Sequence, residues 1–83
     1  MAVYVDNADL SFGRMQMSHM VADTQSELLR MAAIIGVNHK WLQKKGTAHE
    51  HFDICKAKRA LALKAGVIAV TSQELVTIIR NKH

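Results

Sequence analysis

Two apolar runs of the chain are each preceded by the motif T-x-x-E, which begins at Thr24 and at Thr71. In this capping box the threonine hydroxyl accepts a hydrogen bond from one backbone N–H at the helix start, and the glutamate accepts one from another. The two motifs therefore predict helices over residues 24–35 and 72–81. Gly36 is expected to end the first helix, because glycine readily adopts the left-handed conformation that closes a helix.

A third helix is predicted over residues 54–65 from an apolar stripe. Its apolar residues recur at spacings of three and four, at Ile54, Ala57, Leu61 and Ala65. This spacing places them on one side of a helix. Asp53 is the expected N-cap and Gly66 the expected end. The remaining surface of this helix is basic and carries Lys56, Lys58, Arg59 and Lys64.

Strands are expected in the segments between the helices. Residues 3–5 and 67–70 are β-rich and apolar, and residues 17–22 and 40–43 are further candidates. The resulting order is β-β-α-β-α-β-α. It predicts a small single-domain α/β fold, with three helices packed on a mixed, partly parallel sheet of about four strands.

The direction of the first strand decides which polar residues meet. If Asp6, Asp23 and Thr71 all end parallel strands, they lie at one edge of the sheet, where open α/β sheets bind ligands. Gln43 would lie near the same crevice. The connection from Asp6 to Met17 is too short for a crossover helix, so the first two strands could instead pair antiparallel. Asp6 would then lie at the opposite edge.

The composition is that of one soluble domain covering residues 1–83. Apolar residues make up 49% and charged residues 22% of the chain, which excludes a disordered protein. The single cysteine, Cys55, cannot form an internal disulfide and suits a reducing compartment. No apolar run approaches the roughly 20 residues that span a bilayer, and no secretory signal is visible. We therefore expect a cytoplasmic protein without membrane contact.

The net charge of +4 favours anionic partners. The polar segment 44–53 leads into the basic third helix, whose first N–H groups would lie beside His51 and Lys58. Such a helix start favours phosphate. Arg14, Lys44 and Lys45 could extend the positive field. The alternative is a solvated basic face on which Asp53 serves only as a cap.

The histidines offer a second kind of chemistry. His49, His51 and Asp53 alternate, so an extended strand would place them on one face. This pattern could bind a divalent metal or set a general base beside a carboxylate. No second ligand cluster accompanies it, so we expect no metal site and no cofactor. His19, inside an apolar strand, is expected to be structural, and Trp41 to pack across the sheet rather than stack on a base.

Several motifs together resemble a family of small bacterial and phage proteins known only as a domain of unknown function. They are Y-V-D at residues 4–6, S-H-M-V-A-D at 18–23, W-L-Q at 41–43, H-F-D-I at 51–54 and K-R-A at 58–60. The sequence departs from that family at Leu42 and Phe52, where phenylalanine and tyrosine are usual. Because small phage proteins are often host-directed binders, the resemblance implies a protein that sequesters a host nucleotide signal.

The sequence as a whole favours an oligomeric binding protein for a small anionic, nucleotide-like ligand, without turnover. An oligomer is expected because so small a chain would bury such a ligand between subunits. The expected ligand contacts are Arg14, His19, Asp23, Trp41, Gln43, His51, Asp53, Lys58 and Arg59.

Three alternatives remain. A phosphoesterase or nuclease-like enzyme could use His19, Asp23, His51 and Asp53, although no known catalytic signature is present. Nucleic-acid binding by the basic helix is disfavoured by the modest charge and the few aromatic residues. A host-protein adaptor could use an apolar face containing Met15, Met17 and Met20.

Overall fold

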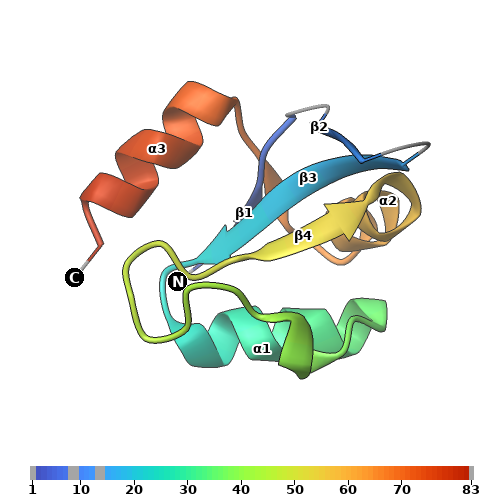
Figure 1. Ribbon diagram of the computed structural model, residues 1–83, viewed down its shortest axis with the longest axis horizontal. Coiled ribbons are helices and arrows are strands. Elements are labelled where there is room, and N and C mark those ends of the chain that lie inside the picture. Colours follow the sequence, from blue (N-terminus) through green and yellow to red (C-terminus); the bar gives the residue numbers. More distant parts are fainter. Residues whose placement is uncertain (1, 8–9, 13–14, 83) are drawn as a thin grey trace.

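The computed structural model describes residues 2–7, 10–12 and 15–82 (Figure 1). Side chains are described for residues 2–7 and 17–82. The strands are β1 (Val3–Val5), β2 (Leu10–Phe12), β3 (Met15–Ala22), β4 (Phe52–Cys55) and β5 (Ile68–Ala69). The helices are α1 (Gln25–Ile35), α2 (Lys56–Lys64) and α3 (Ser72–Arg80), with a short 3-10 helix, η1 (His39–Trp41). The predicted α/β class and element order are confirmed, and β2 is an additional short strand.

Strand β3 organises the sheet. It pairs antiparallel with β1, β2 and β4, while β5 joins β1 in parallel, so the sheet is mixed. Because β1 runs antiparallel to β3, Asp6 lies beside His19, whose carbonyl accepts from the Asp6 N–H at 3.0 Å. Asp23 lies at the other end of the pair and donates its N–H to the Ala2 carbonyl at 3.0 Å. Of the two arrangements left open by the sequence, the antiparallel one is therefore present, and Asp6 and Asp23 do not share a crevice.

The segment around residue 53 is a strand and not the start of a helix. Phe52 and Ile54 alternate into the core from β4, and α2 begins only at Lys56. Asp53 is therefore not an N-cap; Cys55 occupies that position and makes no side-chain cap hydrogen bond. The strand expected over residues 40–43 is also absent, since its first half forms η1 and Gln43 makes only an isolated bridge to His51.

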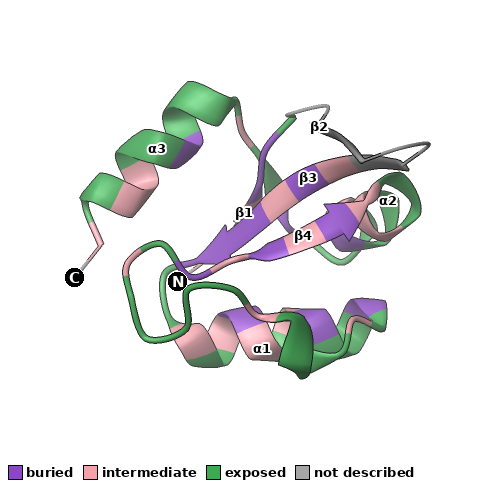
Figure 2. Ribbon diagram, viewed as in Figure 1, coloured by how far each residue is buried: buried purple, intermediate pink, exposed green. Residues whose placement is uncertain are grey.

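The hydrophobic core lies on one face of the sheet, between the strands and helices α1 and α2 (Figure 2). Met20, Phe52 and Ile54 point into it, and each is at most 1% exposed. Met20 therefore lines the core and is not available to a partner surface, which counts against the alternative of a methionine-rich docking face. Among the described residues, α3 contributes nothing to this core cluster.

The predicted helix caps are present. Thr71 accepts from the Glu74 N–H at 3.1 Å, and Glu74 accepts from the Thr71 N–H at 2.9 Å. Thr24 accepts from the Glu27 N–H, and the Glu27 carboxylate accepts from the Thr24 hydroxyl at 2.8 Å where Glu74 accepts from a backbone N–H. Gly36 ends α1 with a φ of 81°. Within the part of the chain that the structure describes, none of the helices has both the length and the apolar character needed to span a membrane.

Candidate functional site

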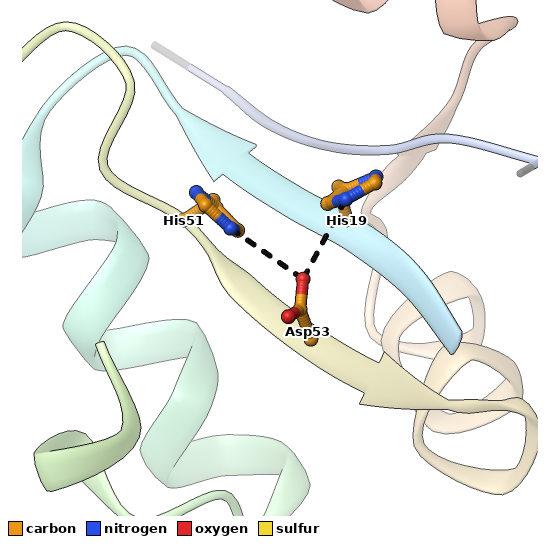
Figure 3. A group of neighbouring side chains, drawn as sticks. All are labelled: His19, His51 and Asp53. Atoms are coloured by element: carbon orange, nitrogen blue, oxygen red, sulfur yellow. Dashed lines mark ion pairs between the residues drawn. The ribbon is translucent and has the colours of Figure 1, made fainter. Parts of the chain in front are cut away.

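A cluster of two histidines and an aspartate lies on the sheet face opposite the core (Figure 3). His19 on β3 is directly opposite Asp53 on β4 in the antiparallel register. His51 precedes Asp53 by two residues, so the pleat turns both side chains to the same face. The His19 Nε2 lies 3.6 Å and the His51 Nε2 3.5 Å from Oδ1 of Asp53. Strand pairing therefore brings together residues that are distant in the sequence.

Each imidazole is oriented by a hydrogen-bond acceptor at its other nitrogen. The His19 Nδ1 lies 2.8 Å from Oδ2 of Asp6, a carboxylate that is only 2% exposed. The His51 Nδ1 lies 2.8 Å from the carbonyl oxygen of His49. A carbonyl and an ionised carboxylate only accept hydrogen bonds, so both Nδ1 atoms carry hydrogen. In the neutral rings both Nε2 atoms are then unprotonated and face Asp53.

The two oxygens of Asp53 have different surroundings. Its Oδ2 accepts from Nε2 of Gln43 at 2.7 Å, and Gln43 is itself fixed by backbone pairing with His51. Its Oδ1 is buried and has no hydrogen-bond partner among the described residues. The separations of 3.5 and 3.6 Å from the imidazoles exceed the usual length of an N–H···O hydrogen bond.

A cavity of about 770 Å³ lies next to the cluster, between the sheet face and α3. Leu75, Val76 and Ile79 recur at helical spacing and form its apolar wall, with Val21 on the sheet. The polar lining consists of Asp6, His19, Lys44, Thr47, His49, His51 and Ser72. The apolar face of α3 therefore borders the cavity, and its buried residue Leu75 lies outside the main core cluster.

The loop over residues 44–50 forms another side of the cavity. Buried Glu50 holds it in place, because one of its oxygens accepts from Gln25 Nε2 at 3.0 Å and from the Gly46 N–H at 3.1 Å. Thr47 donates its hydroxyl to the Lys44 carbonyl at 2.7 Å. Lys44 has a φ of 57°, an unusual value for a residue with a side chain. The loop thus has a defined shape.

A protein-family model matches residues 3–82, nearly the whole chain, and its description is "Protein of unknown function (DUF4031)". The chain belongs to the DUF4031 family. The predicted membership of a family of unknown function is thereby confirmed. The match covers Asp6, His19, His51 and Asp53, so the cluster lies inside the DUF4031 domain. Comparison with curated proteins gives no match, and comparison with solved structures gives none either.

Four of the residues selected from the DUF4031 sequence meet at the cluster: His19, Gln43, His51 and Asp53. Arg59 lies next to it, since its Nε donates to the backbone carbonyl of Asp6 at 3.0 Å. His19 is tied to buried Asp6 by two hydrogen bonds, as a structural residue would be, but its side chain is also 30% exposed and lines the cavity.

The other residues of this DUF4031 protein that were predicted to contact a ligand lie away from the cluster or outside the residues that the structure describes. Asp23 accepts from the Ala2 N–H at 2.9 Å, at the far end of β3. Lys58 extends toward the C-terminal end of α1, where its Nζ would lie 3.0 Å from a Cβ on Gly36. A cation there complements the helix dipole. Arg14 lies outside the described residues. Lys58 and Arg59 therefore point to different partners instead of one phosphate.

Trp41 does not pack across the sheet as expected. It belongs to η1, its residue is 63% exposed, and Nζ of Lys40 lies 5.2 Å from the ring centroid. It borders a second hollow together with Met17, Gln43 and Asp53. Trp41 thus lies beside the cluster, on the side away from the residues of α3.

Sequence reasoning missed two parts of the site. The role of Asp6 as the partner of His19 depends on the antiparallel pairing of β1 with β3. The wall formed by α3 had a visible signal, the spacing of Leu75, Val76 and Ile79, which is equally typical of a helix packed on a core.

Proposed function

We propose that this protein binds a small anionic, nucleotide-like ligand in the cavity beside α3. The observation that carries this proposal is a cavity of about 770 Å³ with one apolar wall and one polar wall. Small-molecule sites typically measure roughly 300–1,000 Å³ and combine apolar surface with a few polar groups. The cavity therefore has the size and the chemistry for a ligand with an apolar ring and a charged group.

The polar wall favours an anion. Lys44 supplies a positive charge, and Ser72 is the first residue of α3, where the helix dipole is positive. The imidazoles of His19 and His51 offer further polar contacts to a phosphate or a ribose. The apolar residues of α3 offer a surface for a base. Both halves of a nucleotide thus find complementary groups in one cavity.

The biological setting is part of the same proposal. The resemblance to small phage proteins supports a host nucleotide signal as the ligand, bound in the cytoplasm. A second copy of the chain could cover the open side of the cavity, which is why we propose a homo-oligomer. Light scattering with and without the ligand measures this oligomeric state directly.

Thermal shift with a panel of mono-, di- and cyclic dinucleotides, in EDTA, tests ligand binding. We expect at least one nucleotide to raise the melting temperature, and calorimetry with it to give a dissociation constant. Lys44→Gln should then weaken binding by about tenfold, the effect of losing about 1.4 kcal/mol. Lys45→Gln is the matched control, since its neighbour Lys44 lines the cavity and Lys45 does not. The proposal fails if no nucleotide gives a shift, or if the two variants behave alike.

A second candidate is hydrolysis of a phosphoester, and the Asp6–His19 pair favours it. A carboxylate that fixes the imidazole at Nδ1 leaves Nε2 ready to take a proton from water. Release of inorganic phosphate or of a leaving nucleotide from the bound ligand measures this activity. Turnover that persists unchanged in His19→Gln would exclude His19 as the base.

A further inference from the structure

We propose that His19, His51 and Asp53 form a binding site for one divalent transition-metal ion. The three ligand atoms all lie within 4.8 Å of one another. Each imidazole Nε2 lies 3.5–3.6 Å from the shared Asp53 oxygen. Two ligand atoms about 2.1 Å from a tetrahedral ion lie about 3.4 Å apart. Two of the three separations are thus already close to those of a coordination sphere, and this inference does not depend on the proposed nucleotide.

The positions of the ring hydrogens of His19 and His51 also support a metal site. Asp6 and the His49 carbonyl require hydrogen on the Nδ1 atoms of His19 and His51, so the neutral rings have lone pairs on both Nε2 atoms. These lone pairs face a carboxylate oxygen that is buried and has no hydrogen-bond partner among the described residues. Three acceptors around one point repel one another unless a proton or a metal ion lies between them. A metal ion satisfies all three.

The surroundings of the cluster are those of metal ligands. Metal-binding histidines usually donate their other ring N–H to a carboxylate or a backbone carbonyl, which fixes the ring. His19 has the carboxylate of Asp6 and His51 has the carbonyl of His49, both at 2.8 Å. Gln43 holds the second oxygen of Asp53 at 2.7 Å. Every proposed ligand therefore has its own supporting hydrogen bond.

The ligand set selects the class of ion. Two imidazoles and one carboxylate suit Zn²⁺ or Fe²⁺, whereas Mg²⁺ and Ca²⁺ prefer oxygen ligands alone. Three protein ligands also leave coordination positions open, as in catalytic zinc sites. Because His19 and His51 line the cavity, an ion between them would be reached from the cavity by water or by a ligand oxygen. The expected occupant is Zn²⁺ or a similar divalent ion.

Calorimetry with Zn²⁺ alone tests the proposal on tag-free, full-length protein that has been stripped with EDTA and dialysed. We expect one Zn²⁺ per chain. Asp53→Asn should lower the affinity by at least about tenfold. This variant is nearly isosteric and keeps an acceptor for Gln43, so it carries the test even if a histidine variant does not fold. His51→Ala should have the same effect.

Two control variants exclude adventitious binding. His49→Ala should bind Zn²⁺ like the wild type, because His49 contributes only its backbone carbonyl to the cluster. Cys55→Ser should also bind normally, because the thiol is not one of the three ligands. The proposal is overturned if the wild type binds no stoichiometric Zn²⁺, or if Asp53→Asn binds it equally well. Because no nucleotide is present, neither result bears on the proposed nucleotide ligand.

Discussion

Asp6 accepts two hydrogen bonds from His19, one from its backbone N–H and one from its ring Nδ1, each at 2.8 Å. The first joins the end of β1 to β3, and the second fixes the rotation of the imidazole. One buried carboxylate therefore ties the geometry of the site to the pairing of the strands. Any change at Asp6 should be detectable both in stability and at the Nε2 atom of His19.

Asp6→Asn should reverse the tautomer of His19. The asparagine oxygen can still accept from the backbone N–H, but its amide nitrogen would then face Nδ1 and donate to it. The ring hydrogen would move to Nε2, so Zn²⁺ affinity should fall about 10- to 100-fold. Unfolding should become easier by about 1–3 kcal/mol.

Nitrogen-15 NMR of the histidine rings measures this tautomer directly. Asp23→Asn is the control, since it changes a carboxylate at the opposite end of β3 and should leave His19 protonated at Nδ1. An unchanged His19 tautomer in Asp6→Asn would contradict the role assigned to Asp6. A loss of stability alone would not support it.

Glu50→Ala should release the loop that borders the cavity. It leaves the Gly46 N–H and the Gln25 amide without their acceptor, at a cost of about 1–3 kcal/mol. Hydrogen exchange should increase over residues 44–50. Glu50→Gln should behave like the wild type, because a single oxygen of Glu50 accepts both hydrogen bonds and the amide retains such an oxygen. Exchange in Glu50→Ala that equals that of the wild type would show that Glu50 does not hold the loop.

Truncation to alanine should change the free energy of unfolding very little at Trp41 and strongly at Phe52. Trp41→Ala should change the free energy of unfolding by less than about 0.5 kcal/mol, because the residue is 63% exposed. Phe52→Ala should cost about 3–5 kcal/mol, because the ring is fully buried. Circular dichroism in urea measures both, since one variant lacks the only tryptophan. A large effect at Trp41 would mean that it packs as the sequence had suggested.

Tyr4 gives a pH-dependent signal. Burial, and next the charge of Asp23, raise the pKa of its hydroxyl above the usual 10.0. The folded chain then keeps the proton to higher pH than the unfolded chain, so this contribution to stability is complete below pH 10.0 and is lost as the pH rises through the folded pKa.

The absorbance of tyrosinate measures the ionisation of Tyr4 alone, because Tyr4 is the only tyrosine. The pH midpoint of the Tyr4 titration should be higher in the folded chain than in the chain unfolded in urea. Asp23→Asn should bring the folded midpoint closer to the unfolded one. A folded midpoint at or below the unfolded one would contradict the assigned surroundings.

Local features were predictable from the sequence. The caps at Thr24 and Thr71 depend on residues three positions apart, and the structure contains both. The segment around Ile54 was ambiguous, because it fits both an apolar helical stripe and the alternation of a strand. The segment forms a strand because it pairs with β3, and the residues of the segment alone do not reveal that pairing.

The cluster required long-range information. The alternation of His49, His51 and Asp53 predicted one shared face, and His51 and Asp53 do lie together, but His49 is not one of the three clustered side chains. Nothing in that motif identifies His19 as the residue opposite Asp53. The absence of a second ligand motif suggested that no metal site exists. In this fold the third ligand comes from another strand, so a search for ligands close in sequence would not find it.

The register of β3 against β4 positions both the cluster residues and the core residues, so a shift of the register would disrupt both. His19 and Met20, successive residues of β3, face the cluster and the core in turn. Suppose that one residue between the start of β3 and His19 is deleted and that His19 stays opposite Asp53 on β4. Every residue of β3 before the deletion then turns to the opposite face of the sheet. Insertions and deletions should therefore be tolerated in the turns but eliminated from these two strands.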